Sequence, residues 1–167
     1  MNLVIIEGPD GSGKTTLAQA IAERHGYVYQ HEGPPPPGED LMLYYLRKLI
    51  VAHDLVVGKA ARGVVFDRFA VGERVYGPLF RNKDGLGPSG GAVFGAVAAR
   101  IGAVQIACLP PIVTCIKNRP EDDPSKLAKA WGAFSGFAPL YGHIRFDYTV
   151  HDFDAMVATP GRVVPRV

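Results

Sequence analysis

Short apolar runs alternate with amphipathic segments along the whole chain. Apolar or β-rich stretches at residues 3–6, 27–31, 64–67, 104–109 and 145–150 predict five strands. Apolar residues recur at helical spacing in residues 15–25, 39–61, 92–101, 110–117 and 126–137, which predicts helices there. Because strands and helices alternate, and parallel strands need helical crossovers, we expect a three-layer α/β/α sandwich around a parallel sheet of about five strands.

Polar and breaker-rich segments separate these elements. Residues 33–38 contain four consecutive prolines between two glycines and predict an extended loop. Residues 82–91 are rich in Gly, Asp, Lys and Pro and predict a mobile loop, and residues 119–125 interrupt the helical pattern. The tail at residues 159–167 has little periodicity, so we expect it to be flexible.

The first predicted strand runs directly into a phosphate-binding pattern. Residues Gly8 to Thr15 read G-P-D-G-S-G-K-T, a full match to G-x-x-x-x-G-K-[S/T]. In such a loop successive N–H groups face one anion, and the following helix presents its positive end to it. The pattern assigns Lys14 to the β- and γ-phosphates of ATP and the Thr15 hydroxyl to Mg²⁺. The predicted nucleotide-binding residues are Asp10, Gly11, Ser12, Gly13, Lys14, Thr15 and Thr16.

Two charged residues end the third predicted strand, at the sheet edge where α/β proteins bind ligands. Asp67 stands where P-loop proteins place the carboxylate that holds Mg²⁺ through water, although a helix cap or a solvated strand end would also explain it. Arg68 follows, and its planar cation is suited to holding a second phosphate in two hydrogen bonds. Together they suggest an acceptor that faces the ATP phosphates.

These two segments resemble the thymidylate kinase family of nucleoside monophosphate kinases, including its short phage members. The first is E-G-P-D-G-S-G-K-T-T at residues 7–16, and the second is D-R-F-A-V-G-E-R-V-Y-G at residues 67–77. The resemblance implies a single P-loop kinase domain over residues 1–167 with a lid at residues 117–126. It also implies that Arg68 contacts the acceptor phosphate and that Asp67 positions Mg²⁺.

Some members of that family carry an arginine inside the phosphate-binding loop, and others place it in the lid. Gly11 stands at the loop position here, so the resemblance implies a lid cation, for which Arg119 is the candidate. Phosphoryl transfer needs positive charge near the oxygens of the migrating group. The competing interpretation is that Arg119 only pairs with the acidic residues at 121–123 in a solvated turn.

Base recognition in the family uses an aromatic residue and an arginine on the helix after the second strand. Tyr44, Tyr45 and Arg47 lie on that predicted helix, and Tyr76 matches the tyrosine of the second segment. Arg74 is a further candidate for the acceptor site. Tyrosines at helical spacing also serve in packing, and exposed arginines often have no specific role.

The sequence departs from the family pattern around the acceptor. Gly72 replaces a serine, Gly77 replaces a glutamine, and the prolines replace an Arg-Glu-Pro motif. We therefore expect a phosphotransferase that acts on dTMP or a related deoxypyrimidine monophosphate, with ATP and Mg²⁺. One alternative is a kinase that phosphorylates a modified base, such as 5-hydroxymethyluracil, in phage DNA. Another is an ATPase or switch without a nucleotide acceptor, which leaves Arg68 unexplained.

Composition adds only broad limits. Hydrophobic residues make up 47% and charged residues 20% of the 167 residues, and no apolar run approaches the length of a membrane span. The chain enters a strand at once without a signal-like segment, so we expect a cytoplasmic protein, in the host cytoplasm if phage-encoded. A net charge of +2 says little about partners. Cys108 and Cys115 are expected to be free thiols. The small residues at 92–101 suit either a homodimer contact or packing within the chain, and we expect a homodimer.

Overall fold

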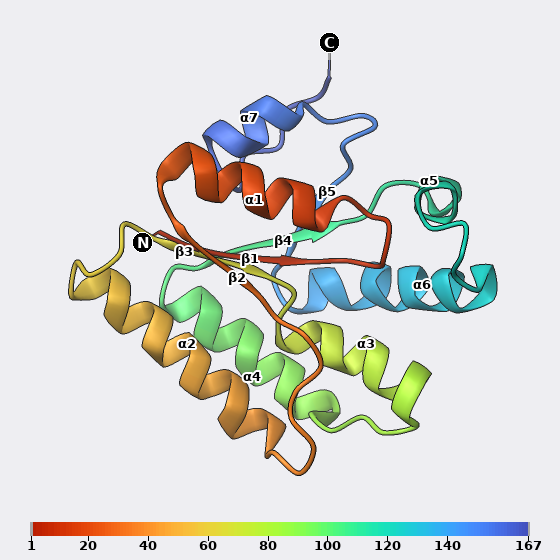
Figure 1. Ribbon diagram of the computed structural model, residues 1–167, viewed down its shortest axis with the longest axis horizontal. Coiled ribbons are helices and arrows are strands. Elements are labelled where there is room, and N and C mark those ends of the chain that lie inside the picture. Colours follow the sequence, from red (N-terminus) through yellow and green to blue (C-terminus); the bar gives the residue numbers. More distant parts are fainter. Residues whose placement is uncertain (1, 167) are drawn as a thin grey trace.

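A single parallel sheet forms the centre of the molecule (Figure 1). The computed structural model describes residues 2–166, except for the side chain at position 88. Within this range the strands are β1 (Leu3–Glu7), β2 (Val28–His31), β3 (Val64–Asp67), β4 (Val104–Cys108) and β5 (Ile144–Phe146). The helices are α1 (Lys14–His25), α2 (Leu41–Val57), α3 (Ala70–Arg81), α4 (Gly87–Arg100), α5 (Ile112–Asn118), α6 (Pro124–Leu140) and α7 (Phe153–Ala158).

The strand order is β2-β3-β1-β4-β5, and every neighbouring pair is parallel. The register places Ile6 of β1 beside Asp67 of β3, and Asp67 beside His31 of β2. The carboxyl ends of the three strands that lead into the phosphate-binding loop, the Asp-Arg segment and the proline loop therefore meet at one edge.

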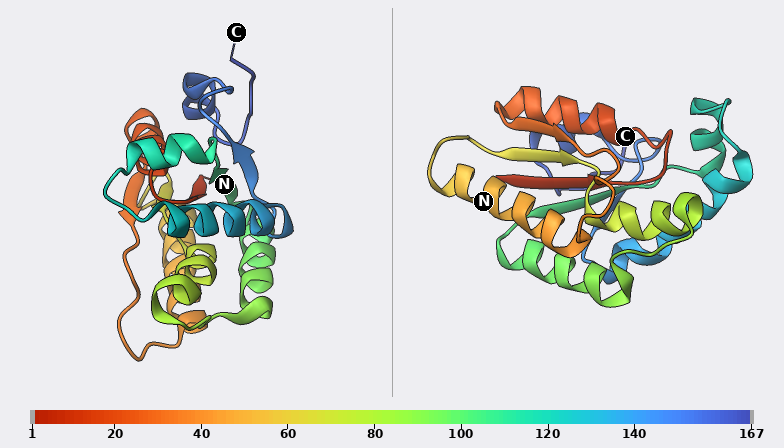
Figure 2. Two further views of the ribbon diagram at one scale, coloured as in Figure 1. Left: turned by 90° about the vertical axis from the view of Figure 1, so that its right-hand side faces the viewer. Right: turned by 60° about the horizontal axis from the view of Figure 1, so that its bottom comes forward.

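Helices cover both faces of the sheet. Helices α1 and α7 pack on the upper face in Figure 1, and α2, α3, α4 and α6 lie on the lower face. Figure 2 shows the same two layers from other directions, with the loop between β2 and α2 extending away from the sheet. Apolar side chains of the strands, such as Ile6 above and Phe66 below, are fully buried against these layers. The expected three-layer sandwich is confirmed.

The segment at residues 82–91 was expected to be a loop, and this expectation is wrong in part because α4 begins at Gly87. Asp84 Oδ1 accepts a hydrogen bond from the N–H of Gly87, the first residue of the helix, at 2.8 Å. A Cβ on Gly91 would lie 2.6 Å from the Tyr141 ring, so the glycine allows α4 to approach α6. The composition of this segment predicts a loop because glycine disfavours a helix. The close packing against Tyr141 that requires glycine is a tertiary contact, which composition does not show.

Other boundaries also differ from the sequence prediction. Helix α2 is shorter than residues 39–61, and α6 is longer than residues 126–137. Strand β5 stops at Phe146 instead of 150, because the Thr149 N–H and hydroxyl both donate to Asp147 Oδ1 and form a turn. Helices α3 and α7 were not predicted.

The chain end lies beside α7. The Asp152 N–H donates to the Val164 carbonyl at 2.8 Å, and the Arg166 N–H donates to the Val150 carbonyl at 2.7 Å. The expected flexible tail is thus hydrogen-bonded to the body of the protein as far as Arg166. Among the described residues, every helix is too short or too polar to pass through a lipid bilayer.

Candidate functional site

The loop between β1 and α1 has the backbone of an anion-binding loop. Gly8 and Gly11 have φ angles of 148° and 73°, and a Cβ on either would lie 2.5 Å from a backbone carbonyl oxygen. Helix α1 begins at Lys14 with no side-chain hydrogen bond capping its first N–H groups. These N–H groups and the positive end of the helix point to one place, as a phosphate site requires.

Lys14 lies within this loop as a nearly buried cation. Its side chain is 5% exposed, and Nζ donates to the Pro9 carbonyl at 3.1 Å and to Asp10 Oδ1 at 3.3 Å. Burial, followed by the charge of Arg68, lowers the pKa of Lys14. The ammonium group has already lost most of its water, so a phosphate that pairs with it meets little competition from solvent.

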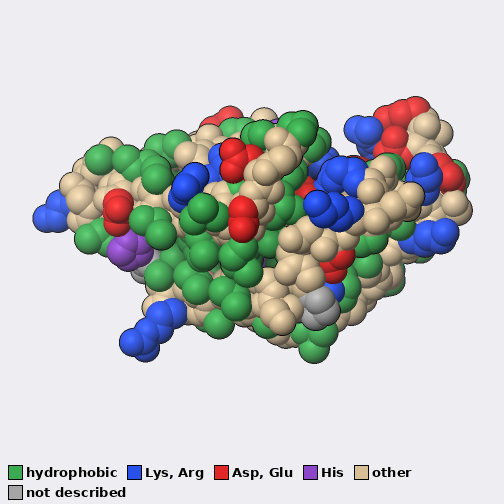
Figure 3. All heavy atoms as spheres, turned by 90° about the horizontal axis from the view of Figure 1, so that it is seen from below, with side chains coloured by type: hydrophobic (Ala, Val, Ile, Leu, Met, Phe, Trp, Pro, Cys, Tyr) green, Lys and Arg blue, Asp and Glu red, His purple; other side chains and the backbone are tan. Residues whose placement is uncertain are grey.

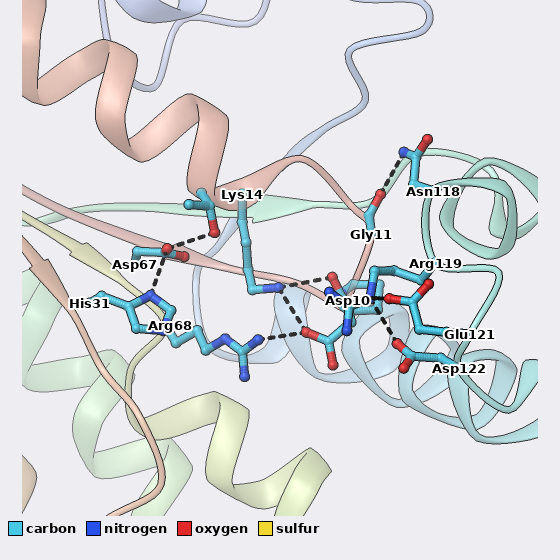
Figure 4. A network of polar contacts seen from close by, with 12 residues as sticks. Asp10, Gly11, Lys14, His31, Asp67, Arg68, Asn118, Arg119, Glu121 and Asp122 are labelled. Atoms are coloured by element: carbon cyan, nitrogen blue, oxygen red, sulfur yellow. Dashed lines mark hydrogen bonds and ion pairs between the residues drawn. The ribbon is translucent and has the colours of Figure 1, made fainter.

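Arg68 approaches the same point from β3. Its Nη2 donates to Asp10 Oδ1 at 2.6 Å, the oxygen that also pairs with Lys14 (Figure 4). Burial opposes ionisation of Asp10, but the charges of Lys14 and Arg68 prevail and lower its pKa. Two cations from different elements thus meet at one carboxylate.

The backbone at Arg68 is unfavourable for a residue with a side chain. Its φ angle is 72°, in the left-handed region that favours glycine. Such a conformation costs about 1–3 kcal/mol and persists where surrounding contacts enforce it, often at functional sites. The Arg68 N–H donates to the Ile6 carbonyl at 2.9 Å, which fixes the turn against β1.

Asp67 lies on the other side of Lys14 and carries three polar contacts on one oxygen. The Thr15 hydroxyl donates to Oδ2 at 2.7 Å, the Tyr29 hydroxyl donates at 2.9 Å, and His31 Nδ1 lies 2.9 Å away. The second oxygen, Oδ1, is buried without a hydrogen-bond partner among the described residues. His31 was missed from the sequence, although it ends β2 as Asp67 ends β3.

The hydroxyl of Thr15 and the free oxygen of Asp67 fit a magnesium ion. Mg²⁺ prefers oxygen ligands, keeps several waters and is held by few protein groups together with phosphates. A buried carboxylate oxygen without a partner is costly unless a cation or water meets it. The sequence prediction that Thr15 and Asp67 act together is therefore compatible with their geometry.

A small inner pocket of about 50 Å³ lies behind Arg68. Its walls include Glu32, Tyr45, Arg68, Gly72 and Tyr76. The Nε of Arg68 and the hydroxyl of Tyr76 are buried and lack hydrogen-bond partners among the described residues. Unsatisfied polar groups on residues that line a cavity favour a polar ligand there.

A second, larger cavity of about 420 Å³, the outer cavity, lies next to the inner pocket. Both are lined by Glu73 and Arg81, which form an ion pair with each other. The prolines at 35–37 form another wall of the outer cavity. Together the walls of the two cavities extend from Arg68 to the proline loop.

Glu7 ends β1 beneath the inner pocket and is fully buried. Its Oε1 accepts the Gly72 N–H at 3.0 Å, and Oε2 has no partner among the described residues. Burial raises the pKa of Glu7 to about 8, although the N–H groups of Gly72 and Phe69 favour the charged form. A Cβ on Gly72 would lie 3.0 Å from Oε2. Because Gly72 has no side chain, there is room for this carboxyl group next to the pocket wall.

Arg119 lies beside the phosphate-binding loop. Its Nε is 3.0 Å from Glu121 Oε1 and 3.0 Å from Asp122 Oδ2. In this structure Arg119 thus pairs with acidic residues of its own turn, as the alternative to a lid cation predicts. Its Cγ would also lie 3.0 Å from a Cβ on Gly11. The side chain therefore lies directly beside Gly11 of the phosphate-binding loop.

A cavity of about 510 Å³ on the far side of the loop was not predicted. Its lining includes Gly13, Thr16, Asn118, Tyr148, Phe153 and Arg166. Asn118 Nδ2 donates to the Gly11 carbonyl at 2.9 Å and to the Tyr148 hydroxyl at 3.0 Å, which ties this wall to the loop. No motif marks these residues, because they come together only where α1, α5 and α7 meet.

Three of the residues predicted for the acceptor lie elsewhere. Tyr44 packs edge-on against Tyr45, and Tyr45 is the one that lines the inner pocket. Arg47 is exposed on the outer face of α2. Arg74 on α3 contacts Asp84, Tyr141 and the ring of Phe137, and these contacts hold its side chain against the end of α6.

Comparisons with known proteins bear on the fold and on one short stretch of sequence. No family model matches the chain. A stretch of 31 residues is 55% identical to a cytidylate kinase from Dichelobacter nodosus, and it spans 19% of this chain and 14% of that protein. The chain thus aligns with only a small part of that relative.

Solved structures match over nearly the whole chain. The YorR protein of Bacillus subtilis, in complex with phosphorylated GDP, has a TM-score of 0.75 at 17% identity over 94% of this chain and 92% of YorR. Deoxyadenosine kinase from M. mycoides with bound dATP has a TM-score of 0.55 at 14% identity over 95% and 96%. The fold is that of a P-loop kinase. Matches to this P-loop kinase fold do not single out the thymidylate kinases.

Proposed function

We propose that this protein is an ATP-dependent phosphotransferase whose acceptor is a deoxynucleoside monophosphate, dTMP or a related deoxypyrimidine. The observation that supports this most is the meeting of Lys14 and Arg68 at Asp10. One cation belongs to the phosphate-binding loop and the other to the strand end opposite it. An ATPase needs only the cation that binds the ATP phosphates, whereas a phosphotransferase also needs a cation for the phosphate of its acceptor.

The donor nucleotide would lie along the loop. Its triphosphate would bind the N–H groups at the start of α1, and its base would enter the cavity beside Tyr148. The volume of about 510 Å³ is within the range of small-molecule pockets. Tyr148 and Phe153 offer aromatic surface for the base.

The protein's own groups would act mainly by position and charge. Lys14 and the loop N–H groups neutralise the oxygens of the transferred phosphoryl, and Arg68 aligns the acceptor. Arg119 would supply further charge once it leaves Glu121 and Asp122. Thr15 and Asp67 would hold Mg²⁺, which would supply positive charge to offset that of the phosphate groups.

The test is a panel assay. ADP formation is measured with ATP alone and with each deoxynucleoside monophosphate, and the product is identified by chromatography. One monophosphate should stimulate ADP formation and appear as its diphosphate. Lys14→Ala should abolish the transfer, whereas the exposed Arg100→Ala serves as a matched control with wild-type rates. Equal hydrolysis under all conditions would support the ATPase instead.

A second candidate takes a hydroxyl group as acceptor, such as 5-hydroxymethyluracil in DNA. Glu32 and Glu73 line the inner pocket, and their carboxyl groups are better suited to a hydroxyl than to a phosphate. The outer cavity, which shares Glu73 and Arg81 with the inner pocket, offers space for such a base. Labelled phosphate in polymeric DNA that contains hydroxymethyluracil, without transfer to any free monophosphate, would favour this candidate.

A further inference from the structure

Glu7 carries a carboxyl group where the alternation along β1 predicts an apolar side chain. Leu3 and Ile5 pack into the apolar cluster below the sheet, and Glu7 continues the same row because side chains alternate along a strand. The layer below the sheet is also hydrophobic over the middle of its outer surface (Figure 3). Glu7 is only 1% exposed. A buried carboxyl group is costly in such surroundings, which indicates a role that an apolar residue cannot fill.

The partner of this carboxyl group is the first turn of α3. Helix α3 begins at Ala70, and Phe69 before it provides no side-chain hydrogen bond to the first N–H groups. Glu7 Oε1 accepts the N–H of Gly72, the third residue of the helix, at 3.0 Å. The side chain of Glu7 thus takes the place of an N-cap, although it comes from a different element.

The residue before Glu7 holds the same turn. The Ile6 carbonyl accepts the N–H of Arg68 at 2.9 Å. Two consecutive residues of β1 therefore hold the turn between β3 and α3 at two points, one through the backbone and one through a side chain. The φ angle of 72° at Arg68 lies between these two contacts and β3, and such a conformation persists only where its surroundings enforce it.

Glu7 also joins this turn to the phosphate-binding loop, which begins at the next residue, Gly8. Figure 4 shows Lys14 of the loop and Arg68 of the turn both pointing toward Asp10. The guanidinium group of Arg68 donates to Asp10 Oδ1 at 2.6 Å. Its place opposite the loop therefore depends on a backbone turn that Glu7 fastens to the end of β1.

We propose that Glu7 is a positioning residue, which caps α3 and thereby fixes Arg68 relative to the phosphate-binding loop. The inference rests on the proposed function, in which Arg68 aligns the acceptor. Glu7 acts through the backbone of the turn and touches none of the reacting groups. Its loss should disturb the acceptor side, while the loop N–H groups still bind ATP. A misplacement of about 1 Å can lower a rate by about 10²-fold.

Two substitutions separate the hydrogen bond from the bulk of the side chain. Glu7→Leu removes the acceptor for the Gly72 N–H, whereas Glu7→Gln keeps an oxygen in a side chain of the same length. Gln105→Leu is the control, because it removes another buried polar side chain, 6% exposed, from the strand beside β1. The full chain is used in every case.

Amide hydrogen exchange, followed by mass spectrometry, measures the turn without any acceptor. Exchange over residues 67–77 should be faster by about tenfold or more in Glu7→Leu, because the first turn of α3 opens locally. Residues 124–140 of α6 should exchange as in the wild type, which separates local opening from general loss of stability. Glu7→Gln and Gln105→Leu should leave exchange at residues 67–77 nearly unchanged.

Kinetics with the monophosphate that stimulates ADP formation tests the effect on the acceptor. Glu7→Leu should lower kcat/KM for the acceptor by about 10–100-fold and change KM for ATP by less than about twofold. Glu7→Gln should restore most of the lost kcat/KM. A general loss of structure would instead affect both substrates, and it would affect Gln105→Leu as well.

Several results would overturn the proposal. They are wild-type exchange at residues 67–77 in Glu7→Leu, an unchanged kcat/KM for the acceptor, equal losses for acceptor and ATP, or a glutamine variant as impaired as the leucine variant. A wild-type protein that transfers phosphate to no acceptor would refute the proposed function instead. Hydrogen exchange would then still decide whether Glu7 holds the turn at Arg68.

Discussion

Arg68 and Asp10 are joined by a hydrogen bond of 2.6 Å between Nη2 and Oδ1, and the same Asp10 oxygen pairs with Lys14. Without the carboxylate, the two cations would repel each other in a partly buried site. Asp10 therefore keeps both groups in place between the two halves of the site. A phosphate on each side would take over these contacts, which makes the pair a sensitive point for mutation.

The backbone strain at Arg68 can be separated from the role of its guanidinium. Arg68→Gly and Arg68→Ala both remove the cation, but only glycine relieves the φ angle of 72°. The glycine variant should be about 1 kcal/mol more stable than the alanine variant in urea unfolding. Both should lose about 10²–10³-fold in kcat/KM for the acceptor. Equal stability of the two variants would argue against strain at this position.

Magnesium dependence tests the contact between Thr15 and Asp67. Asp67→Asn and Thr15→Val should each raise the Mg²⁺ concentration that gives half-maximal activity by about 10–100-fold. Glu23→Gln changes an exposed acid on α1 and is the matched control. The titration uses a fixed ATP concentration, and an unchanged Mg²⁺ midpoint in both variants would contradict the metal assignment.

Glu7 should make stability fall as pH rises. Its pKa is about 8 in the folded protein, against 4.5 for an ordinary glutamate. Between these values the folded state holds a proton that the unfolded state has released. The free energy of unfolding therefore decreases from the lower pKa to the upper one and levels off above it.

Glu7→Gln isolates this contribution, because glutamine resembles the protonated acid and does not titrate. Urea unfolding at intervals from pH 5 to pH 9 should show a smaller decline for the variant than for the wild type. Other titrating groups are common to both proteins and cancel in the difference. Parallel curves would mean that Glu7 is ionised in the folded state.

Gly72 offers a matched pair of substitutions. A Cβ there would lie 3.0 Å from Glu7 Oε2, which has no hydrogen-bond partner among the described residues. Serine can donate to that oxygen, whereas alanine only crowds it. Gly72→Ser should therefore melt at a higher temperature than Gly72→Ala in differential scanning calorimetry. The reverse order would show that Oε2 does not need a donor.

The sequence predicted the parts of the site that depend on contiguous residues. The loop at residues 8–15 and the pair Asp67–Arg68 follow from local patterns, and the structure places both at the same edge of the sheet. The order of the five strands along the chain was also correct, because the central strands are short apolar runs and breaker residues separate the elements. Helix α3 was missed, since Gly72, Gly77 and Pro78 disfavour a helix that tertiary packing sustains.

The acceptor side could not be predicted in the same way. Arg47 has suitable chemistry and lies on α2, but the sequence does not say which face of the helix turns toward the pocket. The structure places Arg47 on the exposed face. His31, Asn118 and Tyr148 were missed because their partners lie on other elements. Local chemistry identifies candidates, and only tertiary packing selects among them.

Binding of a bisubstrate compound tests the central claim most directly. An adenosine and a deoxythymidine joined through a pentaphosphate carry phosphates for the Lys14 side and the Arg68 side at once. Isothermal titration calorimetry should show this compound binding at least about tenfold more tightly than ATP, with Arg68→Ala removing the gain. An affinity equal to that of ATP, unchanged in Arg68→Ala, would contradict a site that holds two phosphates face to face.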